Sequence, residues 1–322
     1  MPAAGITFHA TPMASLRDPE SRLALIGSIV RLPLAFVDAF VRIAIFRPRV
    51  CCTSGGVISI PIAIAARLLR VPVYLWEGNA IPGRANRLLA GWCTKIGVSF
   101  DQARRWLPHG RTVVPGTPIR ASILRWSRDE GRRAFGIPDT AKLVTVSGGS
   151  QGSQRINDAI FGALARVLRN AHVLHITGES TFAKAEAKRE ALSAELRDRY
   201  VVRARLDNDM GGALAAADFV VGRAGSSSIA EPLALGIPCV LVPLGVAMDA
   251  HQDANARSAV EAGAAISMRE SELDADRFTA QINGLLGDAA RLARMAKAAR
   301  AAGRPDAARE IARDVRALGG CA

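Results

Sequence analysis

Short apolar runs alternate with longer amphipathic stretches along most of the chain. The runs are short and rich in β-branched residues, as in Leu143–Ser147 and Phe219–Gly222, which favours strands. Strands that are apolar on both faces and separated by helices are typical of parallel sheets covered on both sides. The segments that we predict to be strands are Val50–Thr53, Val71–Leu75, Ile96–Ser99, Thr112–Val114, Leu143–Ser147, Val173–Thr177, Tyr200–Ala204, Phe219–Gly222 and Pro238–Val242.

The same plan of strand, glycine loop and helix occurs in both halves of the chain. This repetition indicates two doubly wound α/β domains. The best boundary follows Gly116–Arg120, so we predict one domain over residues 1–120 and a second over residues 121–303. Residues 304–322 include an amphipathic helix over Pro305–Leu318, which we expect to return to the first domain.

Composition places the chain among folded globular proteins. Its 322 residues are 49% hydrophobic, enough for a full core, which argues against disorder. The five cysteines are scattered and form no C-x-x-C pair, so neither a disulfide framework nor a zinc site is indicated. A reducing cytoplasm is therefore expected. The first residues lack the order of charged and apolar positions found in a signal peptide.

The net charge of +13 favours anionic partners such as lipid or phosphorylated substrates. Alternatively, the arginine excess reflects residue usage on solvated faces, since five of the 42 basic residues are lysine. Nucleic acid is the least expected partner, because only 5% of residues are aromatic and no basic stripe with interleaved aromatics occurs.

The most apolar segment is Leu23–Ile45. It contains Arg31, Pro33, Asp38 and Arg42, which are costly in hydrocarbon, so we do not expect it to span a membrane. One interpretation is a core helix of an α/β domain. The other is a surface that settles into an anionic membrane leaflet, and both can hold for different faces of one helix.

Two glycine-rich turns follow predicted strands in the second half of the chain. These turns are Gly148–Gly152 and the stretch that runs from Gly222 to Glu231. Ligands in an open parallel sheet lie at the carboxyl ends of strands, and the N–H groups at a helix N-terminus favour anions. In the second turn, Ser226–Ser228 can cap the helix and offer hydroxyls to phosphate, and Glu231 can accept hydrogen bonds from a ribose diol. The alternatives are turns without a ligand and an ordinary carboxylate near a helix N-terminus.

A set of motifs distributed over nearly the whole chain carries a family resemblance. The motifs are Ser54–Pro61, Glu77–Asn79, Pro82–Gly83, Gly116–Arg120, Gly148–Gly152, Asn157, Arg223–Gly225, Glu231, Gly236–Pro238, His251–Gln252 and Ala262–Ala264. In combination and order they resemble the MurG-type glycosyltransferases. The resemblance implies the GT-B fold, in which two Rossmann-like domains face each other across the donor site.

The resemblance implies a function as well. It implies inverting transfer of N-acetylglucosamine from UDP-GlcNAc to an undecaprenyl-linked muramoyl-pentapeptide, in peptidoglycan synthesis. The enzyme would be peripheral, at the cytoplasmic face of the plasma membrane, and would contact an anionic membrane surface. Neither a metal nor another cofactor is implied, and the sequence contains no acidic D-x-D cluster.

The resemblance further implies roles for individual residues, which we state as expectations. Substrate contacts are expected from Asn79, Arg120, Ser150, Gln151, Asp207, Ser226, Ser227, Ser228, Glu231 and Gln252. Within this set, Ser150 and the adjoining N–H groups would hold the diphosphate, and the backbone at Asp207 would pair with uracil. Glu231 would bind the ribose and Gln252 the sugar.

The chain departs from the family pattern in three places. The family begins with a strand and a Gly-x-Gly-Gly-His loop, whereas this chain begins after it, so about 50 residues are expected to be missing and the first domain to be N-terminally truncated. Thr7–Thr11 would then be a later strand. Trp76 replaces the histidine of the family, and Gly78 replaces a glutamine.

These departures affect the expected catalytic base. A positioned base contributes ~10²–10⁴-fold to such a reaction. Glu77 is the remaining candidate, and the alternative for it is a hydrogen-bonded loop anchor. Two other functions stay open: a GT-B transferase with another lipid acceptor such as diacylglycerol, and a non-catalytic remnant that binds a UDP-sugar.

Overall fold

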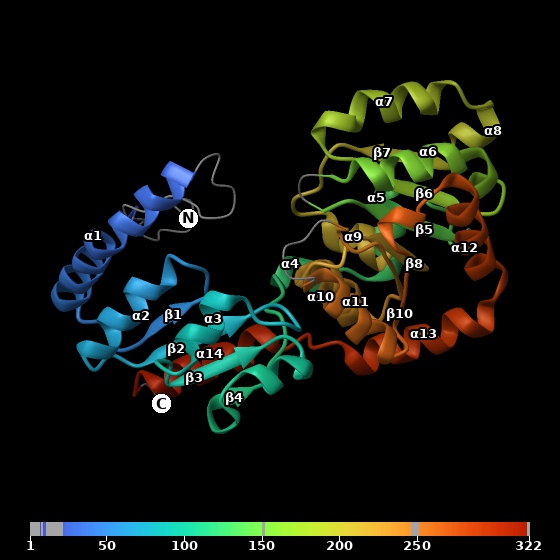
Figure 1. Cartoon of the computed structure of the whole chain (residues 1–322). Helices are drawn as coiled ribbons and strands as arrows, with labels where there is room; N and C mark the ends of the chain where they lie inside the picture. Colours follow the sequence, from blue (N-terminus) through green and yellow to red (C-terminus); the bar gives the residue numbers. More distant parts are fainter. Residues whose placement is uncertain (1–6, 8, 11–21, 150–151, 246–250, 321–322) are drawn as a thin grey trace. The chain divides into compact units, whose positions relative to one another are not determined.

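The computed structural model describes residues 7, 9–10, 22–149, 152–245 and 251–320, with the backbone alone for residues 22–30. The chain divides into two compact units, each built around its own parallel sheet (Figure 1). Unit 1 comprises residues 1–78, 82–114 and 309–322, and unit 2 comprises residues 79–81 and 115–308.

Unit 1 contains a four-stranded parallel sheet in the order β1-β2-β3-β4. Its strands are β1 (Cys51–Thr53), β2 (Val73–Glu77), β3 (Lys95–Val98) and β4 (Thr112–Val113). Its helices are α1 (Arg22–Phe46), α2 (Ser59–Leu68), α3 (Arg84–Ala90), η2 (Asp101–Trp106), η3 (His109–Arg111) and most of α14 (Ala307–Leu318). Lys95 on β3 forms an ion pair with Asp314 at 2.5 Å, which fixes α14 to this sheet.

Helix α1 has one buried face. Ala35, Ala39 and Ile43 recur every four residues and are buried, as the helical period requires, and Ala39 and Ile43 pack into the core of unit 1. Large apolar side chains on other faces of the same helix stay exposed. No helix in the described part of the chain is long and apolar enough to cross a membrane.

Two arginines adopt a left-handed backbone, Arg47 (φ 48°) directly after α1 and Arg70 (φ 59°) after α2. The N–H of Arg70 donates to the carbonyl of Arg67 and the N–H of Val71 to that of Ala66, which is a Schellman motif. Glycine is usual at such a position, because a residue with a Cβ atom costs about 1–2 kcal/mol in this conformation. Both arginines precede strands and so lie at the N-terminal edge of the sheet.

Unit 2 contains a six-stranded parallel sheet in the order β10-β9-β8-β5-β6-β7. The strands are β5 (Leu143–Ser147), β6 (His172–Ile176), β7 (Tyr200–Arg203), β8 (Phe219–Gly222), β9 (Cys239–Leu241) and β10 (Ala265–Ser267). The helices are α4 (Ala121–Leu124), α5 (Arg128–Phe135), α6 (Gln154–Leu168), α7 (Glu179–Glu190), α8 (Ala194–Arg197), α9 (Met210–Ala215), α10 (Ser226–Ala234), α11 (His251–Glu261), η4 (Glu270–Glu272), α12 (Ala275–Gly287) and α13 (Ala289–Ala302). Numbered from β5, the strand order is the doubly wound 3-2-1-4-5-6 arrangement.

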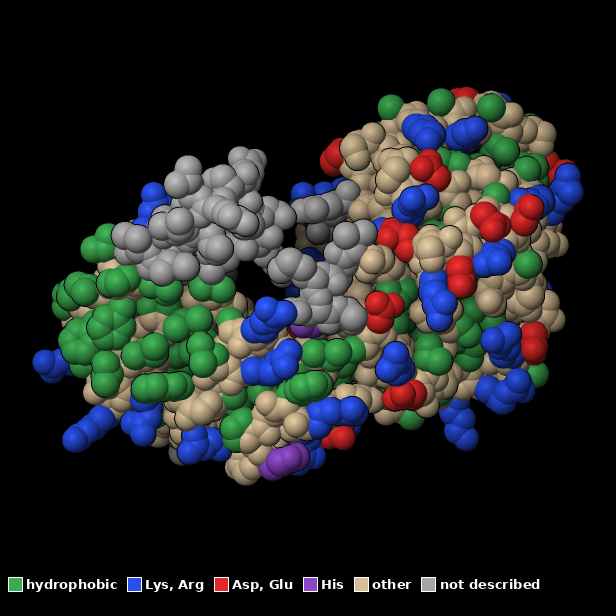
Figure 2. Space-filling model, viewed as in Figure 1, with side chains coloured by type: hydrophobic (Ala, Val, Ile, Leu, Met, Phe, Trp, Pro, Cys, Tyr) green, Lys and Arg blue, Asp and Glu red, His purple; other side chains and the backbone are tan. Residues whose placement is uncertain are grey.

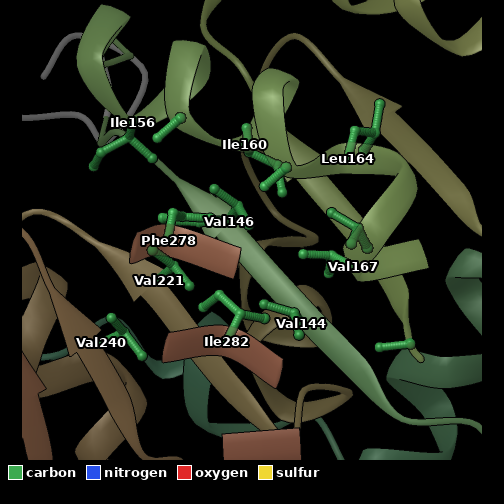
Figure 3. Packing of buried hydrophobic residues seen from close by; sticks show 14 of the residues in the cluster. Val144, Val146, Ile156, Ile160, Leu164, Val167, Val221, Val240, Phe278 and Ile282 are labelled. Carbon is green, nitrogen blue, oxygen red and sulfur yellow. The ribbon is translucent and has the colours of Figure 1, made fainter. Parts of the chain in front are cut away.

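The core of unit 2 lies between its sheet and helices α6 and α12 (Figure 3). Ile156, Ile160 and Leu164 point from α6 toward the valines of the central strands, and Phe278 and Ile282 approach from α12. These side chains are at most 3% exposed. Helices α5 and α9 contribute to a second apolar cluster with residues of β5 and β6. Because both faces of the central strands are covered, the loops at their ends carry the polar chemistry.

The predicted α/β class is confirmed, and all nine predicted strands form within two residues of their expected bounds. Strand β10 was not predicted, because its three residues include a single large apolar side chain, Ile266. The predicted strand Thr7–Thr11 is wrong at Thr7, His9 and Ala10, which are exposed and belong to no strand. Phe8 and Thr11 lie outside the described residues.

Candidate functional site

Strands β5 and β8 lie side by side in unit 2, although β6 and β7 separate them in sequence. From β5 the chain winds toward β7, and from β8 it winds toward β10, so the winding direction changes between these two strands. Ligands of doubly wound sheets bind at the carboxyl ends of the strands at such a point. Both predicted glycine turns lie there.

The first turn needs its glycines because the backbone is closely approached at Gly148 and Gly152 and left-handed at Gly149. A Cβ atom on Gly148 would lie 2.2 Å from the nitrogen of Ser153, and one on Gly152 would lie 2.6 Å from the carbonyl of Thr177. Gly149 has φ 87° but faces open space, with no atom within 4 Å of a Cβ position. The turn is therefore tight on its protein side and open at Gly149.

Ser150 and Gln151, which we expected to contact the diphosphate, lie outside the described residues. Just beyond them, Ser153 caps α6 by accepting a hydrogen bond from the N–H of Ile156. The position of the α6 N-terminus at the end of β5 is thus defined.

A buried network fixes the first turn of α6. Asn157 donates to the carbonyl of Thr177 at 2.9 Å, and its Oδ1 lies 3.0 Å from Nε2 of His175. Nδ1 of His175 lies 2.8 Å from the Tyr200 hydroxyl. Since Asn157 Oδ1 can only accept, Nε2 carries the proton and Nδ1 accepts from Tyr200. Burial lowers the pKa of His175 to about 3, so the ring stays neutral at neutral pH.

The second turn leads into α10, whose N-cap is Gly225. We predicted that Ser226–Ser228 cap this helix, and this is wrong: the N-cap position holds a glycine, and no side-chain capping hydrogen bond forms among the described residues. The N–H groups of the first turn consequently remain available, as does the positive end of the helix dipole. This arrangement is the usual one for anion binding at a helix N-terminus.

A salt bridge holds the second turn in place. Arg223 NH2 lies 2.6 Å from Glu270 Oε1, and both side chains are only 13% exposed. Arg223 also donates to the carbonyls of Val242 and Pro243, while Glu270 Oε2 accepts from the N–H of Gly245. Burial raises the pKa of Glu270, but the hydrogen bonds from Gly245 and Arg223 outweigh it and lower the pKa overall. The loops after β8 and β9 are thereby tied together.

Two amides of α11 add to this arrangement. Oε1 of Gln252 accepts from the N–H groups of Ala224 and Leu244, so Nε2 is the atom that remains for a ligand. Asn255 is buried; its Oδ1 accepts from the N–H of Ala80 and its Nδ2 donates to Asn79 Oδ1 at 3.2 Å. The segment 79–81 is grouped with unit 2. The structure thus brings Asn79 next to α11.

Glu231 lies on the second turn of α10, with its side chain 18% exposed. Burial raises its pKa, and Arg120, whose NH2 is 3.9 Å from Oε1, partly opposes that rise. The structure therefore places Arg120 beside Glu231. Asp207 follows β7 at the same carboxyl edge of the sheet, but its side chain is exposed and paired with Arg205.

Glu77, the candidate base, lies at the end of β2 in unit 1 and is 2% exposed. Its Oε2 accepts from Nδ2 of Asn86 at 2.7 Å and from the N–H of Gly83 at 3.1 Å. Oδ1 of Asn86 in turn accepts from the N–H of Gly56. This geometry favours the anchoring role, because the carboxylate holds two loops of unit 1 together.

Sequence reasoning did not assign two residues that organise the site: Arg223 was visible in a motif without a role, and Glu270 had no signal. From the sequence, Asn255 could reach one ligand together with His251 and Gln252, but its buried contacts were not predicted. Within the described ranges, no group of three acidic, histidine or cysteine side chains is arranged to hold a metal ion.

Comparisons with known proteins identify the family of the chain. The family model for the glycosyltransferase family 28 C-terminal domain matches residues 143–311, and the N-terminal domain model matches residues 1–98. A solved structure of Acinetobacter baumannii MurG superposes with a TM-score of 0.74 at 21% identity, over 98% of this chain and 86% of that one. A putative UDP-N-acetylglucosamine 2-epimerase from Listeria monocytogenes has a TM-score of 0.65 at 13% identity, over 94% of this chain and 82% of its own.

Two curated relatives cover almost all of the chain. A protein of Halothermothrix orenii is 35% identical over 95% of this chain and 84% of its own length. A protein of Salinibacter ruber is 37% identical over 99% of this chain and 84% of its own length. Both are named UDP-N-acetylglucosamine–N-acetylmuramyl-(pentapeptide) pyrophosphoryl-undecaprenol N-acetylglucosamine transferase. The chain therefore belongs to glycosyltransferase family 28 and, within it, to the MurG-type N-acetylglucosaminyltransferases.

Proposed function

We propose that this protein transfers N-acetylglucosamine from UDP-GlcNAc to an undecaprenyl-linked muramoyl-pentapeptide, a step of peptidoglycan synthesis. The names of its curated relatives support this reaction. The observation that carries it in the structure is the pair of turns at the carboxyl ends of β5 and β8, each leading into a helix N-terminus. Such a pair suits a nucleoside diphosphate.

Each part of the donor has a candidate partner in unit 2. The diphosphate lies against the uncapped N-terminus of α10 and the open side of Gly149. Glu231 accepts hydrogen bonds from the ribose hydroxyls, and Nε2 of Gln252 donates to the sugar. The backbone at Asp207 is the proposed partner of uracil. Helix N-termini and Arg120 then offset the charge that develops on the leaving diphosphate.

The reaction is a single inverting displacement. A hydroxyl of the acceptor attacks C1 of the sugar and loses its proton to a base, while the bond from C1 to the diphosphate oxygen breaks and UDP leaves. We propose that Glu77 anchors loops of unit 1 rather than acting as this base, because its carboxylate accepts hydrogen bonds from Gly83 and Asn86 of its own unit.

Replacing Glu77 with glutamine tests the anchoring role. We expect the free energy of unfolding to fall by about 1–3 kcal/mol, because one carboxylate oxygen becomes an amide NH₂ group, which cannot accept a hydrogen bond from a neighbouring donor. Asn86→Ala, which removes one hydrogen-bond donor to Glu77, should cost a similar amount. Urea unfolding measures both. A stable Glu77→Gln protein that binds donor normally but has lost turnover would make Glu77 the base instead.

We further propose that unit 1 attaches peripherally to the anionic cytoplasmic face of the plasma membrane. Among the α1 side chains that the structure describes, the exposed large apolar ones, hereafter the α1 apolar face, are Leu34, Val37, Val41, Ile45 and Phe46. Figure 2 shows hydrophobic side chains gathered over this helix. Arg31, Arg42 and Arg47 are exposed on or next to the same helix. An exposed apolar surface with arginines at its rim is typical of a helix that lies in a membrane interface.

The test of the proposed reaction uses purified full-length protein. UDP-GlcNAc at 100 times its Kd should raise the free energy of unfolding by about 2.7 kcal/mol, seen as a higher melting temperature. Turnover with a lipid-linked muramoyl-pentapeptide, followed by UDP release, then separates an enzyme from a binder. Turnover with diacylglycerol alone would move the assignment to another acceptor. If UDP-GlcNAc causes no thermal shift, the proposed donor site is contradicted.

A further inference from the structure

We propose that unit 1 holds the phosphate group of an anionic phospholipid in a pocket at the N-terminal edge of its sheet. The proposal rests on the membrane attachment proposed above and adds a specific headgroup site to it. The pocket has a volume of about 350 Å³, within the range of small-ligand sites. Its lining includes Arg67, Arg70, Pro72, Trp92, Thr94 and Arg111. We call it the arginine pocket.

The topology brings these residues together. In a parallel sheet, helices end and strands begin at the same edge. Arg67 and Arg70 come from the end of α2, Trp92 follows α3, and Arg111 directly precedes β4. Three guanidinium groups from two separate connections therefore line one pocket. Planar guanidinium groups are well suited to phosphate, since each can donate two parallel hydrogen bonds.

The backbone of Arg70 argues for a role of its side chain. Arg70 occupies the left-handed position of a Schellman motif, where glycine is favoured. An arginine there retains backbone strain that a glycine would release, and such retained strain points to function. An arginine that merely faces the carbonyls at a helix end does not need this position, because Arg67 already lies in the last turn of α2.

The charge of the pocket is poorly compensated. Among the residues that the structure describes, no ion pair involves Arg67, Arg70 or Arg111. Arg111 donates to the carbonyls of Gly91 and Cys93, which fixes its position at the end of α3. The pocket is thus partly preorganised and needs an anion to balance it.

The surroundings favour a lipid over a soluble phosphate. Leu68 on α2 is 59% exposed and Trp92 is 44% exposed. Ile45 and Phe46, 78% and 81% exposed, end α1 just before β1 and so lie at the same edge of the sheet. An apolar rim around a phosphate site is expected where acyl chains lie next to the headgroup.

The test measures binding of the full-length protein to vesicles by flotation. We use phosphatidylcholine vesicles containing a fixed fraction of phosphatidylglycerol, and vesicles brought to the same surface charge with oleate, which has no phosphate. Arg70→Gly is the main variant, because glycine fits the left-handed backbone and the melting temperature should not fall. We expect about fivefold weaker binding to phosphatidylglycerol vesicles and a smaller loss on oleate vesicles. Arg67→Gln should add a similar loss.

Arg294→Gln, on an exposed position of α13, removes the same charge elsewhere and should change binding less than twofold. If Arg70→Gly binds vesicles as well as this control does, or if its binding weakens equally on both kinds of vesicle, the arginine pocket is not a phosphate site. If soluble glycerol 1-phosphate binds as tightly as the vesicles, the lipid assignment is overturned.

The double variant Ile45→Ser/Phe46→Ser distinguishes the headgroup site from the membrane attachment on which it rests. It should weaken binding to all vesicles, because it removes apolar area from the α1 apolar face. If it does so while the arginine variants do not, the membrane attachment holds and the pocket fails. Wild-type protein that binds no vesicles would end both proposals.

Discussion

Replacement of Glu231 with alanine is expected to weaken binding of UDP-GlcNAc about 10- to 150-fold. Hydrogen bonds to a charged group contribute about 1.5–3 kcal/mol, and 1.4 kcal/mol corresponds to a factor of ten. The carboxylate is largely buried on α10, at the end of β8 where the donor is proposed to lie. A partly buried acceptor that faces a diol has few alternative partners, so its loss is felt in affinity.

The helix itself should tolerate this change. Alanine is the best helix former, and Pro232, not Glu231, is the unusual residue of α10. Isothermal titration with UDP-GlcNAc measures the affinity, and urea unfolding shows that the fold is intact. Glu195→Ala, an exposed carboxylate on α8, is the matched control and should bind normally. Normal affinity in Glu231→Ala would mean that the ribose lies elsewhere.

A variant of Arg120 can be tested in the same titration experiment. Its guanidinium lies 3.9 Å from Glu231 and is 60% exposed, so the pair is weak and solvent-screened. A ribose whose hydroxyls donate hydrogen bonds to Glu231 releases Arg120 toward the diphosphate. Arg120→Ala should therefore reduce affinity for UDP-GlcNAc more than affinity for uridine, which lacks the phosphates.

Local pattern predicted the strands and the glycine turns, because both depend on neighbours in sequence. The β-branched runs of β5 and β8 are buried on both faces, and the bare turns follow from close backbone contacts at Gly148 and Gly152. The order of the strands in each sheet is a consequence of chirality and winding, not of local pattern. The sequence indicates this strand order only through its resemblance to a family.

The contacts that shape the site join residues far apart in sequence. Asn255 reaches Ala80 across 175 positions, and Arg223 reaches Glu270 across 47. No periodicity predicts such pairs, since each joins segments that only the folded chain brings together. The predicted serine cap failed for a local reason: three serines are good caps, but the glycine before them took the N-cap position. The left-handed backbone of Arg70 contradicts the local preference for glycine, so it too was invisible in the sequence.

Arg223→Met is expected to lower the free energy of unfolding of unit 2 by about 3 kcal/mol and to weaken donor binding. Methionine keeps much of the apolar stem but leaves the carboxylate of Glu270 without its charged partner. The two carbonyls after β9 that Arg223 holds also lose a donor. Since these contacts tie the turn before α10 to the loop after β9, the diphosphate site loses its preorganisation.

The loss should depend on pH in a defined direction. Hydrogen bonds from Gly245 and Arg223 hold the pKa of Glu270 below its ordinary value of 4.5. The ionised pair therefore stabilises the fold above that pH, and this stabilisation is lost as the pH falls through the lower pKa of the folded state. The gap between wild type and Arg223→Met should accordingly be largest near neutral pH and should narrow in acid, where a protonated Glu270 leaves no buried charge.

Urea unfolding at several pH values, together with titration of UDP-GlcNAc, measures both effects. Arg277→Met is the matched control, because its ion pairs with Glu272 and Asp274 are exposed and worth less than about 1 kcal/mol. The double variant Arg223→Met/Glu270→Met should recover part of the stability, since it removes both charges at once, but not the donor affinity. If Arg223→Met unfolds like Arg277→Met and binds donor normally, the salt bridge does not organise the turn, and the α10 N-terminus must be held by the amides of Gln252 and Asn255 instead.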